Sequence, residues 1–114
     1  MSREDFISYY EDRHIPLILS LTHIPVVYKR SYLNRGDPFN LEGECIEFDV
    51  VTEQIFESRE DQQAWMSRLT EPGVRERVRA DEEKFLDHSH YWAYAVDERE
   101  TDQADASIEQ TQTF

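Results

Sequence analysis

The sequence has 114 residues, and its 12 lysines and arginines stand against 25 aspartates and glutamates, which gives a net charge of −13. This length supports one domain with a single modest core, and the acidity makes nucleic acids and anionic membranes poor partners. With one cysteine, no transmembrane-length apolar run and no secretory leader, the sequence indicates a soluble cytoplasmic protein without an internal disulfide or a thiolate zinc site.

The first predicted element is a helix that begins almost at the first residue. Ser2 and Asp5 form an approximate capping box, and acidic residues in the first turn favour the helix dipole. Pro16 should kink or end the regular helix, because proline has no backbone N–H and clashes with the preceding turn. The inward stripe predicted from helical periodicity consists of Phe6, Tyr10, His14 and Leu17.

Two strands follow the helix. Residues 26–33 are rich in β-branched and aromatic side chains, and residues 34–44 form a glycine-containing surface loop. Residues 45–56 are the clearest strand, with alternation that separates two faces. One face holds the carboxylates, and its members are Glu47, Asp49, Val51, Glu53 and Ile55. The other face consists of Ile46, Phe48, Val50, Thr52, Gln54 and Phe56.

The second half of the chain predicts a helix, a final strand and a tail. Ser58 with Asp61 opens the helix, which is interrupted at residues 70–73 and then resumes. Residues 88–96 read as the final strand. We therefore place a domain over residues 1–97 and a disordered acidic tail over residues 98–114, where the apolar content is almost nil.

The order helix, strand, strand, helix, strand indicates an α+β fold. With one strand placed ahead of it, this order becomes the ferredoxin-like βαββαβ arrangement, an antiparallel sheet with both helices on one face. The first strand is missing from this sequence. We therefore expect either pairing of the exposed sheet with a second subunit or a natural start upstream of Met1.

Three segments carry a resemblance to a known family. "MSREDFISYYEDRHIPLI" resembles the first-helix signature of the EthD-like family, in which a Ser-x-x-x-Phe-x-x-Tyr helix runs into His-x-Pro-Leu. "FDVVTEQIFES" resembles its aspartate-x-x-x-glutamate strand, and "DEEKFLDHS" its late-helix segment. The resemblance as a whole spans residues 2–96, with the three segments in the family's order.

The resemblance implies a fold and a range of activities. It implies a ferredoxin-like fold that pairs its sheet across a homodimer, the dimeric α+β barrel, with a pocket in each subunit. Cofactor-free relatives process aromatic polyketides or small lactones, and the wider superfamily includes anthrone-type monooxygenases, cyclases and haem enzymes. The family alone therefore fixes no reaction.

His14 is the leading candidate for catalysis. It follows Tyr10 by four residues, so the imidazole and the phenol are neighbours in an apolar seam. Imidazole transfers protons near neutral pH, which suits a general acid or base. The alternative is a core histidine that is hydrogen-bonded to a carboxylate or carbonyl and stabilises the helix beside Pro16.

Asp49 and Glu53 are the candidate carboxylate partners. Their Cα atoms should lie roughly 13 Å apart on one strand face, which is too far for a glycosidase-type pair. One of them could orient His14 across the seam, or both could face solvent on the strand. The sequence leaves these alternatives open.

The candidate substrate-binding residues come from three elements, and they are Tyr28, Arg30, Trp65, His88 and Tyr94. Arg30 could hold a substrate carboxylate, although a surface ion pair is the more ordinary role. Aromatic side chains of a small domain belong mostly to its core. His88 and His90 could share a metal in principle, but no third ligand is evident, and no metal or other cofactor is expected.

These observations predict a cofactor-independent lyase of secondary metabolism, a decarboxylase or dehydratase acting on an aromatic or polyketide-type intermediate. His14 would act as acid or base with Tyr10 and with Asp49 or Glu53. A non-catalytic small-molecule-binding barrel and an interaction module acting through the acidic tail are the competing classes. No phosphate-binding loop, nucleotide fingerprint or Gly-x-Ser-x-Gly elbow is present, which argues against kinases, dehydrogenases and serine hydrolases.

Overall fold

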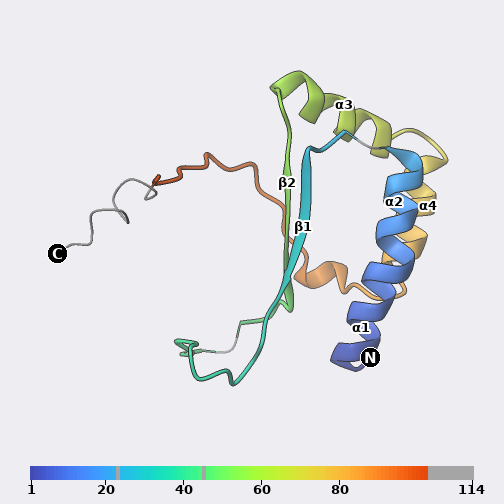
Figure 1. Ribbon diagram of the computed structural model, residues 1–114. Coiled ribbons are helices and arrows are strands. Elements are labelled where there is room, and N and C mark those ends of the chain that lie inside the picture. The colour runs from blue at the N-terminus through green and yellow to red at the C-terminus, as the bar shows by residue number, and fades with distance from the viewer. Residues whose placement is uncertain (23, 45, 103–114) are drawn as a thin grey trace.

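The computed structural model describes residues 1–22, 24–44 and 46–102. Its elements follow one another as α1 (Arg3–Tyr9), η1 (Tyr10–His14), α2 (Ile15–Leu21), β1 (Val27–Tyr32), β2 (Val50–Ile55), α3 (Arg59–Leu69), α4 (Val74–Glu82) and η2 (His88–His90). The chain is an α+β protein whose two strands form an antiparallel sheet, which is compatible with the predicted ferredoxin-like fold. Helices α1, α2 and α4 lie on one side of this sheet, and α3 lies at one end of it (Figure 1).

The first helix starts as predicted but does not end at Pro16. Ser2 accepts a hydrogen bond from the Asp5 backbone N–H at 3.1 Å, and α1 continues through η1 into α2. Residues 10–14 form a π-helical segment, in which the Ile15 N–H donates to the Tyr10 carbonyl. Pro16 has no N–H, so the series of backbone hydrogen bonds along the helix is interrupted at this residue. The helix accommodates the interruption as one wider, π-helical turn. The two helices are therefore one rod with a π segment just before the proline.

The wider turn also changes which residues face inward. Phe6, Tyr10 and His14 keep the predicted stripe, but Ile18 rather than Leu17 is buried next along it. A π-helical turn holds more residues than an α-helical turn. Residues spaced by four, such as Tyr10, His14 and Ile18, therefore stay on one face across η1. The prediction for Leu17 was wrong because it assumed regular helical spacing.

Both predicted strands form, and both are shorter than predicted: β1 covers Val27–Tyr32 of residues 26–33, and β2 covers Val50–Ile55 of residues 45–56. Strand β1 pairs with β2 in the register Val27 to Ile55 and Tyr32 to Val50. Strand β2 begins only at Val50, opposite the end of β1, and one further backbone hydrogen bond follows, from the Leu33 N–H to the Asp49 carbonyl at 2.9 Å. Just ahead of it, the carbonyls of Ile46 and Phe48 accept hydrogen bonds from the Arg35 guanidinium at 3.0 and 2.6 Å.

The predicted final strand over residues 88–96 does not form. Residues 88–90 are a 3-10 turn, capped by Asp87 through the Ser89 N–H, and the residues that follow have no strand assignment. Among the described residues the sheet consists of β1 and β2, and this segment pairs with neither of them. Backbone that has no neighbouring strand cannot form a ladder.

The core is small and sits between the first helix and the sheet. Its buried members are Tyr10, His14, Ile15, Ile18, Thr22 and Trp65. The opposite face of the sheet is open, and Val27 and Val51 there are 38% and 42% exposed.

Helix α3 is capped by Ser58, as predicted, with the Asp61 N–H at 3.0 Å from its hydroxyl. Of the predicted tail, residues 103–114 lie outside the described residues.

Candidate active site

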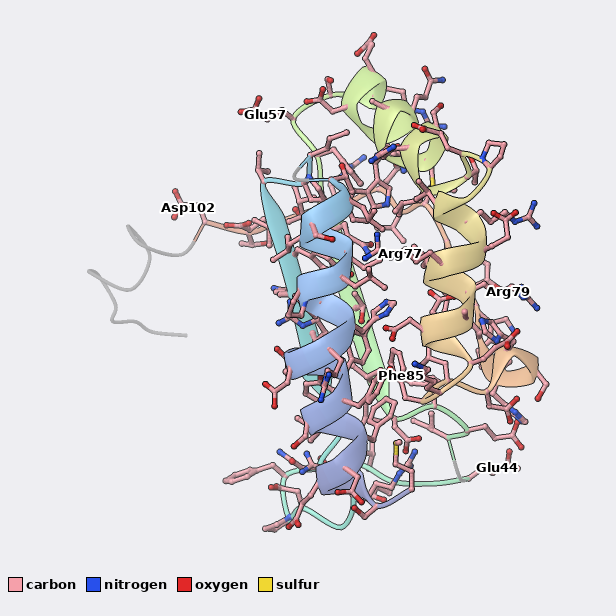
Figure 2. The ribbon with its side chains drawn as sticks, turned by 90° about the vertical axis from the view of Figure 1, so that its right-hand side faces the viewer. Glu44, Glu57, Arg77, Arg79, Phe85 and Asp102 are labelled. Carbon is pink, nitrogen blue, oxygen red and sulfur yellow. The ribbon has the colours of Figure 1, made fainter. Side chains whose placement is uncertain are left out.

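His14 occupies the centre of the helix-covered side of the molecule. It is the last residue of η1, it is 4% exposed, and its ring packs 4.9 Å from Phe85 and 5.5 Å from Tyr10 between ring centroids. Figure 2 shows Phe85 between the first helix and the chain that leaves α4. These aromatic neighbours hold the imidazole in one orientation and exclude water from its faces.

Asp81 of α4 fixes the orientation of that ring. The Nδ1 atom of His14 lies 2.9 Å from Oδ2 of Asp81, and the Tyr9 hydroxyl donates to Oδ1 of the same carboxylate at 2.6 Å. Burial raises the pKa of Asp81, but the hydrogen bonds from Tyr9 and His14 outweigh it and hold this pKa below its usual value. Asp81 is therefore ionised near neutral pH, which favours a proton on Nδ1 and leaves Nε2 for chemistry.

A second carboxylate lies near the other ring nitrogen. Oε2 of Glu82 is 4.0 Å from Nε2 of His14, and Oε1 of Glu82 is 3.2 Å from Nε2 of His88. The Glu82 side chain is only 17% exposed. A base that is oriented by one carboxylate and faces a second one has the parts for taking and returning a proton.

Three phenols lie on the sheet side of this group. The Tyr10 hydroxyl is 2.7 Å from Oγ1 of Thr52 on β2. Burial is the main cause of the raised pKa of Tyr10 and Tyr28. Tyr91 is 49% exposed, and desolvation of its hydroxyl, together with the nearby Glu82 carboxylate, raises its pKa as well. All three stay neutral at physiological pH and act there as hydrogen-bond donors or acceptors.

The structure does not bring Asp49 or Glu53 to His14. Thr52 points toward Tyr10, so its neighbour Glu53 points to the open face of the sheet, where it lies 3.9 Å from Lys29. Asp49 is 69% exposed in its side chain and pairs with Arg35 at 3.1 Å. Within this chain, the solvent-facing alternative describes both residues.

Arg30 is held by a carboxylate of the protein itself. Its Nε and Nη2 atoms donate to the two oxygens of Glu11 at 2.9 and 2.5 Å, and Nη1 donates to the Tyr28 carbonyl. Tyr32 donates to the same Glu11 carboxylate. A substrate carboxylate would have to displace Glu11 to reach this guanidinium.

The remaining predicted binding residues are dispersed. Trp65 is 6% exposed and packs against Tyr28 and Phe56 at the α3 end of the sheet. His88 reaches the site through Glu82, whereas Tyr94 is 82% exposed. The structure therefore brings together Tyr10, His14, Tyr28 and His88.

His90 has different partners from His88. It lies 3.0 Å from Asp87 and 3.2 Å from Glu47, away from the Glu82 contact that His88 makes. Across the described ranges, no three His, Cys, Asp or Glu side chains are grouped closely enough to hold a metal ion.

The sequence reasoning missed Asp81, Glu82, Tyr9 and Phe85 as site residues. The signal was present in the segment "DEEKFLD", where Asp81 and Phe85 are four apart on a helix and can face the same neighbour. The sequence does not show that this neighbour is His14, because the contact depends on how α4 packs on η1.

Comparison with known proteins adds one finding. The family model for the EthD domain matches residues 1–89, a range that contains His14, Asp81, Glu82 and Phe85. Searches of curated proteins and of solved structures gave no match. In the part of the chain that the structure describes, no helix has the length and apolar character needed to cross a membrane.

Proposed function

The chain belongs to the EthD domain family, and we propose that it is a lyase in which His14 transfers protons to and from an aromatic or polyketide-type substrate. The observation that carries this proposal is the buried hydrogen bond between Asp81 and Nδ1 of His14, with Nε2 directed toward a second carboxylate. A buried, oriented imidazole is the usual arrangement of a histidine acid or base.

In dehydration, one proton moves from a substrate carbon to His14 and then from His14 to the leaving hydroxyl group. Nε2 of His14 removes a proton from the carbon next to a carbonyl, and the electron pair forms the new carbon–carbon double bond as the hydroxyl group leaves. The imidazolium then protonates that hydroxyl, so water is released and the histidine returns to its neutral form. Asp81 stabilises the transient imidazolium through Nδ1.

Decarboxylation uses the same groups in another order. The carbon–carbon bond to a carboxylate breaks, carbon dioxide leaves, and the electron pair becomes an enolate or phenolate conjugated with the ring. A neighbouring phenol, such as Tyr10, donates a hydrogen bond to the developing oxyanion, and imidazolium returns a proton to carbon. Dehydration returns the proton of the substrate to the departing hydroxyl, whereas decarboxylation consumes one proton, which His14 takes up from solvent before it protonates the carbon.

We place the substrate on the Nε2 side of His14, against the sheet. Tyr10 and Tyr28 supply aromatic surface and hydroxyl groups there, and their raised pKa values reflect a low-dielectric surrounding, whereas Tyr91 adds a half-exposed ring. Such a surrounding strengthens each hydrogen bond to a developing charge.

We also propose that two copies pair through their sheets to form the dimeric α+β barrel. The sheet is covered on one side only (Figure 1), and the open side carries Val27 and Val51. The radius of gyration is 17.8 Å, whereas a compact domain of this length has about 13 Å. A second copy would bury the open face.

The test is incubation of the purified protein with a panel of aromatic β-keto and ortho-hydroxy carboxylic acids and β-hydroxy ketones, followed by mass spectrometry. The proposal predicts loss of carbon dioxide or water from at least one of them. The second candidate is a non-catalytic binding protein, which the 4% exposure of His14 and its hydrogen bond to Asp81 favour. In that case a panel member raises the melting temperature without being converted.

A further inference from the structure

A groove runs along the other side of the helix pair, away from the sheet. It has a volume of about 420 Å³, and it is bounded by the first helix on one side and by α4 on the other. Arg13 and Leu17 contribute from the first helix, and Arg77, Ala80 and Lys84 contribute from α4 and the turn after it. We call these five residues the cationic groove. Its volume is in the range of small-molecule sites.

Helical spacing explains why the cations gather there. Arg77 and Ala80 are three residues apart and share one face of α4, and Lys84 follows four residues later in the turn that leaves the helix. Figure 2 shows Arg77 directed toward the first helix and Arg79, two residues later, directed away from it. Arg79 pairs instead with Glu83 at 3.5 Å on the outer face.

The charges of the groove oppose the charge of the whole chain. Arg13, Arg77 and Lys84 form no ion pair within the described ranges. Asp81 is the carboxylate that lines the groove, and its two oxygens accept hydrogen bonds from Tyr9 and His14. Three cations around one hydrogen-bonded carboxylate leave a local excess of positive charge in a protein of net charge −13.

We propose that the cationic groove binds a small organic anion, in which a carboxylate or phosphate group is joined to an apolar body. The two guanidinium groups and the ammonium group match the anionic head, and the aliphatic side chains of Leu17 and Ala80 match the body. The inference is independent of the proposed lyase activity, because it requires neither turnover nor access to His14.

The experiment is an NMR titration of the ¹⁵N-labelled full chain at constant ionic strength. The probes are 2-naphthoate, 2-naphthyl phosphate, inorganic phosphate and the uncharged 2-naphthol. We expect saturable shifts centred on Arg13, Arg77 and Lys84 with at least one naphthyl anion, and weaker binding of 2-naphthol and of inorganic phosphate. The stronger of the two naphthyl anions identifies the head group.

The matched variants are Arg77→Gln and Arg79→Gln, which remove the same charge from opposite faces of one helix. Arg77→Gln should weaken binding about fivefold, and Arg79→Gln should change it less than about twofold. Both side chains lie on the surface, so the spectra of the free variants should show a retained fold. Equal effects of the two variants, shifts without saturation, or equal binding of 2-naphthol would overturn the proposal.

Discussion

The Nδ1 atom of His14 lies 2.9 Å from Oδ2 of Asp81, and this contact joins two helices across 67 residues of sequence. Both side chains are shielded, with 5% and 15% exposure. The contact therefore links the irregular turn of the first helix to α4, and it sets the orientation of the imidazole at the same time.

Replacing Asp81 should cost stability as well as function. In Asp81→Asn the amide can present an acceptor to only one of its two present donors, Tyr9 and His14, so one buried polar group loses its partner. We expect the free energy of unfolding to fall by about 1–3 kcal/mol. Urea denaturation measures this, with exposed Asp12→Asn as the control. Equal urea midpoints for the two variants would show that the contact contributes nothing to the fold.

The same carboxylate predicts a pH dependence of stability. The pKa of Asp81 is lowered by folding from its usual 3.8, so the folded state binds this proton less readily than the unfolded state. Its stabilising contribution is therefore present above that usual pKa and is lost as the pH falls through the folded-state pKa. Urea midpoints measured from about pH 6 to about pH 2 should fall more steeply for wild type than for Asp81→Asn. If the urea midpoints of wild type and Asp81→Asn fall in parallel as the pH is lowered, Asp81 is not the origin of the acid sensitivity.

Arg30 and Glu11 should be energetically coupled. Their two-point contact connects β1 to η1, and the hydrogen bond from Arg30 is the main cause of the lowered pKa of Glu11. A double-mutant cycle with Arg30→Gln and Glu11→Gln should give a coupling of about 1 kcal/mol in urea denaturation. If the effects of the two substitutions are additive, Arg30 is not tied to Glu11 and could hold a substrate carboxylate, as the sequence suggested.

The open sheet face should carry the proposed dimer contact. Val51 lies on that face opposite Ser31, and a lysine there would place a charge in the interface. We expect Val51→Lys to be monomeric in light scattering at concentrations where wild type is dimeric. The control is Met66→Lys, because Met66 is 56% exposed on α3. A wild-type monomer, or a dimer that Val51→Lys leaves intact, would contradict this arrangement.

The local features of this fold were predictable from the sequence, and the long-range ones were not. Ser2 and Ser58 marked helix starts because capping depends on residues three apart, and the β1–β2 pair followed from composition and order. The segment 88–96 failed as a strand because strand formation requires a partner that the sequence pattern cannot supply.

The site was predicted in part for the same reason. His14 and Tyr10 were found because they are neighbours on one helix, and their contact is local. Of the two alternatives left open for Asp49 and Glu53, this chain shows the solvent-facing one, since alternation placed them on one face but could not say which face the helices cover. The partner actually present, Asp81, depends on how α4 packs on η1.

The most direct test of the account is the turnover of His14→Gln on whichever panel substrate the wild type converts. Glutamine can still bond to Asp81 but cannot transfer protons near neutral pH, so the variant separates catalysis from structure. We predict a loss of about 10²–10⁴-fold in kcat with a retained fold, and an unchanged rate for the control Asp12→Asn. A folded His14→Gln that turns over the substrate at the wild-type rate would contradict the role of His14 as the acid and base.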